Sequence, residues 1–129
     1  MSINAVLTDR APKPIGPYSQ AISVKNPGGL LFCSGQIPLN PSTGKIETDD
    51  VVEQTRIVMN HLKAVVEQGG SELGKVIRCT IFLKDMNDFP KVNEIYGSYF
   101  QGVPPSRACV EVARLPKDVK VEIDAIALI

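Results

Sequence analysis

Residues that could support chemistry gather near the carboxy terminus, in two stretches with the alternation typical of strands. Side chains two apart in a strand share a face, so Arg107 and Cys109 point the same way. In the second stretch, Glu122 lies on the polar face, opposite the apolar residues Val121 and Ile123. If the two strands are neighbours, Arg107 and Glu122 could face one cleft together.

An arginine and a glutamate that share a cleft have a definite chemical use. The planar guanidinium of Arg107 could bind a substrate carboxylate through two parallel hydrogen bonds. Glu122 could then orient a water molecule or transfer a proton. The same residues could instead form a solvated strand face or a structural ion pair, and their spacing leaves both interpretations open.

Other residue types give no sign of a metal or cofactor site. The three cysteines, Cys33, Cys79 and Cys109, are far apart and form no CxxC pair, which excludes a zinc knuckle and a thioredoxin-type motif. We expect them to be reduced, as small buried groups. His61 is the only histidine and has no companion at ligand spacing, so we expect a surface or structural role for it. We therefore expect no metal and no cofactor.

Composition narrows the class of protein. The chain has 14 basic and 14 acidic residues, and this balance argues against a bulk electrostatic attraction to nucleic acid or to an anionic membrane. No apolar run approaches the roughly eighteen residues of a membrane helix, and residues 1–10 lack the apolar core of a signal peptide. We expect a soluble protein of the cytoplasm, with an organelle as the alternative. Its 129 residues suit a single domain, 1–129.

The positioning elements can be predicted from periodicity. Residues 19–24, 29–36 and 75–83 have the pattern of strands. Residues 51–68 are predicted to form a helix, with capping side chains at 48–50 and glycines at 69–70. Its apolar stripe consists of Val51, Thr55, Val58, Leu62 and Val65.

The second half of the chain completes the predicted fold. A shorter helix starts near Asp88, tolerates Pro90 in its first turn and ends before Pro104-Pro105. Its inner side would carry Phe89, Val92, Tyr96 and Tyr99. Two strands follow, at 107–113 and 119–128. This order predicts an α+β fold with two helices on one face of a mixed sheet, and a partner subunit is the natural cover for the other face.

Four segments resemble the reactive intermediate deaminase family, also called the Rid or endoribonuclease L-PSP family. The carboxy-terminal signature is matched by residues 105–116, with Arg107 and Cys109, and by Val121-Glu122-Ile123. The other matches are Gly16-Pro17-Tyr18-Ser19-Gln20, Ser34-Gly35-Gln36-Ile37-Pro38 and the helix at 89–99. The resemblance covers nearly the whole chain, in order and without large insertions.

The resemblance implies a chorismate-mutase-like fold, a six-stranded mixed sheet with two helices on one face. Three subunits would pack their sheets into a barrel, with active sites in the clefts between neighbours. Members of the arginine-bearing RidA branch hydrolyse reactive enamines and imines, such as 2-aminoacrylate, to 2-keto acids and ammonia. This 2-iminobutanoate/2-iminopropanoate deaminase activity protects other enzymes from damage and needs no cofactor.

Site residues carry over position by position. Arg107 matches the arginine that binds the substrate carboxylate, and Glu122 matches the acidic residue associated with the attacking water. Cys109 is expected to line the pocket rather than act as a nucleophile, because no base accompanies it. The remaining substrate-binding positions are Tyr18, Ser34, Gly35 and Asn93.

Two other classes of function stay open at this stage. One is an endoribonuclease or translation inhibitor, for which salt-dependent RNA affinity would be the signature. The other is a non-enzymatic protein that binds small carboxylates or coats unfolded chains. The sequence does not identify the preferred imine, and it does not separate proton transfer by Glu122 from placement of water.

Overall fold

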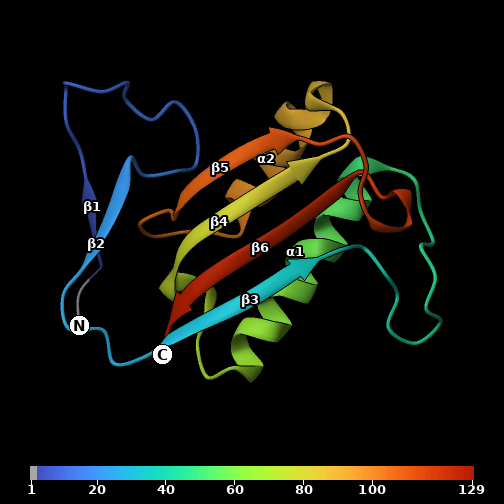
Figure 1. Cartoon of the computed structure of the whole chain (residues 1–129), viewed down its shortest axis with the longest axis horizontal. Coiled ribbons are helices and arrows are strands. Elements are labelled where there is room, and N and C mark those ends of the chain that lie inside the picture. Colours follow the sequence, from blue (N-terminus) through green and yellow to red (C-terminus); the bar gives the residue numbers. More distant parts are fainter. Residues whose placement is uncertain (1–2) are drawn as a thin grey trace.

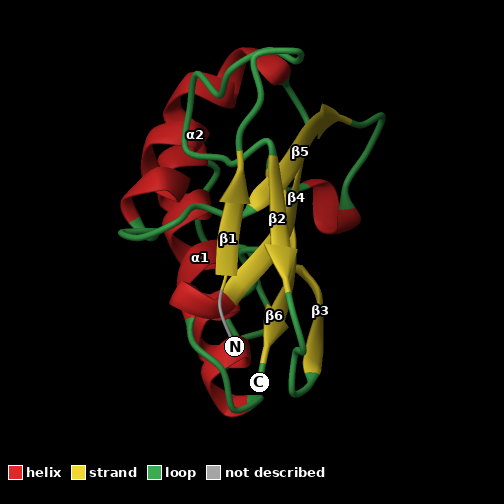
Figure 2. Cartoon of the chain, turned by 90° about the vertical axis from the view of Figure 1, so that its left-hand side faces the viewer, coloured by secondary structure: helices red, strands yellow, loops and turns green. Residues whose placement is uncertain are grey.

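The computed structural model describes residues 3–129, which form a sheet layer and a helix layer. The elements in chain order are β1 (Ile3–Val6), β2 (Ala21–Val24), β3 (Leu30–Gln36), α1 (Val51–Gln68), β4 (Val76–Leu83), α2 (Phe89–Ser98), β5 (Ser106–Glu111) and β6 (Val121–Leu128). Figure 1 looks onto the sheet with α1 and α2 behind it, and Figure 2 shows α1 and α2 on the same side of the sheet. The predicted α+β class with two helices is confirmed.

The strands pair into two sheets rather than one. Four strands form a sheet in the order β3-β6-β4-β5, in which β4 and β5 are parallel and the other pairs are antiparallel. β1 and β2 form a separate antiparallel pair. The single six-stranded sheet implied by the resemblance is therefore absent from the described residues. Between β2 and β3 the chain turns through Asn26, whose φ is 52°, and Figure 1 shows β1 and β2 standing apart from β3.

Helix α1 has the predicted bounds, because both ends carry the expected signals. The side chain of Asp50 accepts a hydrogen bond from the amide of Val52, and Gly70 follows the helix with a φ of 88°. One member of the predicted stripe is wrong. Val66 is fully buried, whereas Val65 is 38% exposed, because the core face continues from Leu62 by four residues rather than three.

Helix α2 and the last strands also follow the prediction, with shifted ends. Pro90 lies in the first turn of α2, and Val92 and Tyr96 are fully buried on its inner side. β6 begins at Val121, two residues later than predicted, and a short 3-10 turn, Pro116–Asp118, lies in the connection before it. Two non-glycine residues there, Lys117 and Asp118, have positive φ, which is incompatible with a strand.

The two faces of the four-stranded sheet differ in burial. Alternate residues of β4 and β6 point toward the helices and form the core, among them Cys79, Ile81, Leu83, Val121, Ile123 and Ala125. The opposite face carries exposed apolar side chains: Phe32 is 70% exposed, Leu30 45% and Val110 41%. Within residues 3–129, no helix combines the length and apolarity needed to cross a membrane.

Candidate functional site

Arg107 projects from the edge strand β5 toward the helix layer. Its Cα partner on β4 is Cys79, which is fully buried in the core. Side chains of paired residues share a face of a sheet, so Arg107 lies on the helix side. This placement brings the side chain of Arg107 against α2.

The guanidinium of Arg107 lies among aromatic rings. Its Cζ is 5.3 Å from the ring centre of Tyr18, 5.5 Å from that of Phe89 and 5.2 Å from that of Tyr96. Such cation–π contacts hold the charge without neutralising it. Nη1 is buried without a hydrogen-bond partner, and no carboxylate in the described part of the chain forms an ion pair with Arg107. Burial lowers the pKa of Arg107, while the nearby Tyr96 acts in the opposite direction.

A further polar group near Arg107 also lacks a partner. Within residues 3–129, Asn93 Oδ1 and Arg107 Nη1 are buried without a hydrogen-bond partner, and the buried Tyr96 hydroxyl has the Cys79 thiol beside it. Asn93 and Tyr96 lie one turn apart on α2, on the side facing Arg107. A Cβ atom on Gly16 would lie 3.2 Å from Arg107 Nη2 and 3.5 Å from Asn93 Nδ2, so glycine lets the chain pass close to both. Because buried polar groups are normally satisfied, this concentration indicates a site for a polar ligand or water.

Cys109 forms part of the same depression. It pairs with Ile81 and so shares the helix-side face with Arg107. A cavity of about 290 Å³ is lined by Tyr18, Phe89, Arg107 and Cys109. Burial raises the pKa of the Cys109 thiol, and the opposing effect of Arg107 is smaller. The sulfur is therefore protonated near neutral pH, which suits a pocket wall better than a nucleophile.

Glu122 lies elsewhere, on the open face of the sheet. It pairs with Phe82, and its neighbours Val121 and Ile123 point into the core on the other side. The condition for Arg107 and Glu122 to face one cleft, that their strands be neighbours, is therefore not met within one chain. β4 separates β5 from β6, and the two side chains project from opposite faces.

Gly35 lies directly beneath the Glu122 carboxylate. The register between β3 and β6 slips between Cys33 and Gln36, and this irregularity brings Gly35 against Glu122. A Cβ atom there would overlap Glu122 Oε2 and lie 2.8 Å from its Cδ, so the close approach requires glycine. Burial, and secondarily the charge of Asp124, raises the pKa of Glu122.

The predicted site residues thus form two groups. The arginine half-site contains the predicted residues Tyr18, Asn93, Arg107 and Cys109, together with Phe89 and Tyr96. The glutamate half-site contains Gly35 and Glu122, and Ser34 directly precedes Gly35 on β3. In the order β3-β6-β4-β5, the first group is at the β5 edge and the second is beside the β3 edge.

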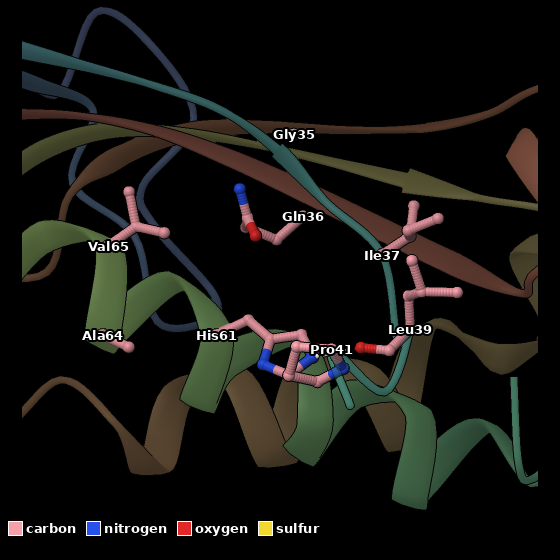
Figure 3. A pocket seen from close by; sticks show the side chains of 8 residues that line it. All are labelled: Gly35, Gln36, Ile37, Leu39, Pro41, His61, Ala64 and Val65. Carbon is pink, nitrogen blue, oxygen red and sulfur yellow. Dashed lines mark hydrogen bonds between the residues drawn. The ribbon is translucent and has the colours of Figure 1, made fainter. Parts of the chain in front are cut away.

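A larger hollow near α1 has different chemistry. It has a volume of about 330 Å³ and lies between the end of β3 and α1, lined by Gly35, Gln36, Ile37, Leu39, Pro41, His61, Ala64 and Val65 (Figure 3). No lining side chain is formally charged. His61 Nε2 is 2.8 Å from the carbonyl oxygen of Leu39, a hydrogen bond that fits the structural role expected for it. This hollow contains no lysine or arginine that could bind a carboxylate.

Sequence reasoning missed three contributors to the arginine half-site. Phe89 and Tyr96 were expected only as the inner side of a helix, and Gly16 only as part of a motif. The helical spacing of Phe89, Asn93 and Tyr96 was the available signal, because residues three and four apart share a helix face. The residue that this face of α2 contacts, Arg107, is set by the position of β5.

Comparisons with known proteins agree with this architecture. The family model described as Endoribonuclease L-PSP matches residues 8–129. A RutC family protein of Pyrococcus horikoshii is 54% identical over 122 residues, covering 95% of this chain and 94% of that protein. The 2-iminobutanoate/2-iminopropanoate deaminase of Escherichia coli is 46% identical over 126 residues, covering 95% of each chain.

A solved structure extends the likeness to three dimensions. The crystal structure of Escherichia coli TdcF with bound serine has a TM-score of 0.74 and 45% identity, and the match covers 98% of each chain. Together with the family model, which spans nearly the whole sequence, these likenesses place the chain among known proteins. The chain belongs to the endoribonuclease L-PSP family, the reactive intermediate deaminase family that its motifs resemble.

Proposed function

We propose that this protein is an imine deaminase that converts 2-aminoacrylate and related enamines or imines to 2-keto acids and ammonia. The observation that carries the proposal is the Arg107 guanidinium, which is held by aromatic rings and has no acidic partner in residues 3–129. A cation kept free in this way suits a small carboxylate. The named activity of the Escherichia coli relative supports the same reaction.

The chemistry requires positioning more than a reactive group on the protein. An enamine tautomerises to an imine, whose carbon already accepts water. Water adds across the C=N bond, and the C–N bond then breaks, releasing ammonia and leaving a carbonyl. Arg107 would hold the carboxylate, and Glu122 would orient the water or accept its proton. The backbone carbonyl of Cys109 would accept a hydrogen bond from the substrate nitrogen.

The two half-sites support an assembly in which neighbouring subunits complete each other. They lie toward opposite edges of the four-stranded sheet, so a head-to-tail contact would bring the β3 side of one subunit to the β5 side of the next. Such contacts form a closed ring when the rotation from one subunit to the next closes. The exposed Phe32, Leu30 and Val110 would be covered by the sheets of the partners. We propose a homotrimer of single-domain subunits, cytoplasmic and without a cofactor, in which Glu122 acts in the site of the neighbouring subunit.

The test is release of ammonia and pyruvate when 2-aminoacrylate is generated in situ by a dehydratase. Wild type should accelerate hydrolysis over the spontaneous rate, and Arg107→Ala should remove the acceleration. Arg56→Ala is a matched control, because this exposed arginine on α1 pairs only with Glu53. A folded wild type that leaves the rate unchanged would contradict the proposal.

The same preparations can separate the rival functions. A ribonuclease would cleave RNA and would bind it with an affinity that falls steeply as the salt concentration rises. A carboxylate sensor would bind pyruvate through Arg107 without accelerating imine hydrolysis. A chaperone-like protein would suppress aggregation equally well with Arg107→Ala.

A further inference from the structure

The segment 7–20, between β1 and β2, contains Tyr18 and places its ring next to Arg107. Internal hydrogen bonds hold this segment in a defined shape. We call it the strap. Gln20 organises its first half: Oε1 accepts a hydrogen bond from the Thr8 amide at 2.7 Å, and Nε2 donates to the carbonyl oxygens of Thr8 at 3.0 Å and Pro12 at 2.8 Å. The strap is thus tied to itself at its base.

Ser19 ties the other end of the strap to the beginning of β5. Its hydroxyl donates to the carbonyl oxygen of Pro104 at 2.6 Å, and its amide donates to that of Pro105 at 3.2 Å. The side chain of Ser19 is nearly enclosed, with 6% of the residue exposed. Hydrogen bonds in such a place are costly to lose, because the remaining acceptor is shielded from water.

The hydrogen bonds of Ser19 to Pro104 and Pro105, which we call the clamp, lie close in the chain to both members of one cation–π pair. Ser19 directly follows Tyr18, whose ring centre lies 5.3 Å from Arg107 Cζ. Pro105 immediately precedes β5 and lies two residues before Arg107. The clamp is therefore one residue from Tyr18 on one side and two from Arg107 on the other.

Helix α2 packs against the strap at Pro17. A Cβ atom on Gly97 would lie 3.1 Å from both Cβ and Cγ of Pro17, so glycine at this position lets Pro17 pack against the helix. Pro17 is itself next to Tyr18. The tyrosine is consequently fixed from two directions, by packing on α2 and by the hydrogen bonds of Ser19.

We propose that Ser19 is a positioning residue that holds Tyr18 over Arg107 and so pre-forms the carboxylate site. The inference rests on the proposed function, since it concerns the same site. The hydrogen bonds of Ser19 go to Pro104 and Pro105 rather than to Arg107, so in this proposal Ser19 acts through Tyr18. Without its hydroxyl, the strap can move and the aromatic wall over the guanidinium is no longer fixed before the ligand arrives.

Binding of pyruvate, a 2-keto acid of the product class, provides the measurement. Ser19→Ala should raise the Kd for pyruvate about three- to tenfold, the range expected for one buried hydrogen bond. The apparent KM for the imine should rise similarly while kcat stays within about twofold, because the reacting groups are unchanged. Ser19→Thr, which keeps the hydroxyl, should restore binding. Ser23→Ala on the exposed side of β2 is the matched control.

A double-mutant cycle separates positioning from a general structural effect. In a Tyr18→Ala background, adding Ser19→Ala should leave the pyruvate Kd unchanged, because the residue through which Ser19 acts is gone. An equal loss of binding with and without Tyr18, or wild-type binding by Ser19→Ala, would overturn the inference while leaving the deaminase intact. Wild type that binds pyruvate no better than Arg107→Ala would remove the proposed function itself.

Discussion

Arg107 and Glu122 project from opposite faces of the same four-stranded sheet. Arg107 is in register with Cys79 of the core, whereas Glu122 is in register with Phe82 on the open face. The two residues that the chemistry needs together are therefore separated within one chain. Either they act in one site contributed by two subunits, or only one of them takes part in the reaction.

Mixing two inactive variants should restore activity. If Arg107 of one subunit works with Glu122 of the next, Arg107→Ala and Glu122→Gln are each inactive as pure assemblies. After dissociation and reassembly in equal amounts, about a quarter of the interfaces should combine an intact Arg107 with an intact Glu122. The rate of ammonia release should then return to about a quarter of the wild-type value. A mixture that stays inactive after verified exchange would show that the two residues do not meet across an interface.

Replacing Arg107 with methionine should cost function but not stability. Arg107→Met keeps a long flexible side chain and removes a half-buried charge that has no acidic partner in the described chain. We expect the free energy of unfolding to hold or to rise by about 1 kcal/mol. Pyruvate binding should weaken by roughly 100-fold, the effect of losing two charge-assisted hydrogen bonds. Denaturant titration at equal protein concentration, with Arg56→Met as the exposed control, checks the first part.

A methyl group at Gly35 should displace the Glu122 carboxylate. The added Cβ overlaps Glu122 Oε2, so Gly35→Ala should lower kcat for imine hydrolysis at least tenfold. Pyruvate binding should change only a few-fold, because Arg107 is untouched. Gly102→Ala is the control, since no atom lies within 4 Å of a Cβ placed there. Unchanged kcat in a folded Gly35→Ala protein would argue against a role for Glu122.

The titration of Glu122 should report whether Arg107 of a neighbouring subunit is near. Within one chain, burial and Asp124 raise the pKa of Glu122. A guanidinium close by lowers the pKa of a carboxyl group. Glu122 should therefore titrate at a higher pH in Arg107→Ala than in wild type, as measured by carbon NMR with Glu122→Gln for assignment.

The free energy of unfolding should depend on pH through the same titration of Glu122. A raised carboxyl pKa means that the folded state favours the protonated form, so Arg107→Ala should lose stability as the pH rises through the raised pKa. Adding Glu122→Gln should abolish this loss, which is expected to be under about 1 kcal/mol because Glu122 is only partly buried. Identical Glu122 titrations in wild type and Arg107→Ala would place the two residues far apart in the assembly.

The Cys109 thiol should react slowly with alkylating agents. Replacing Cys109 should leave the rate of imine hydrolysis largely intact. Burial raises the pKa of all three thiols, that of Cys79 to about 12. Alkylation by iodoacetamide at neutral pH should be slow, should speed up in alkaline solution, and should reach Cys109 first because Cys33 and Cys79 are buried. Mass spectrometry of the modified peptides gives the order. Cys109→Ser should keep most of kcat, and a loss above 100-fold would instead indicate a nucleophile.

The sequence by itself determined the fold class and most of the elements. Helix α1 has strong periodicity, a capping aspartate and terminal glycines, and all of these signals lie within or next to its own stretch of sequence. Alternation likewise decides which residues of a single strand share a face, so it paired Arg107 with Cys109 and separated Glu122 from Val121 correctly. The motifs identified the family, because their residues and their order are specific.

Only the tertiary structure decided how those faces combine. Strand order places β4 between β5 and β6, and it depends on packing between residues far apart in the chain. The β3 irregularity at Gly35, the strap clamped by Ser19 and the aromatic rings around Arg107 likewise arise from contacts that no local pattern encodes. Periodicity fixes the relative directions of neighbours on one element, whereas the direction of one element relative to another is set by the packing of the whole core.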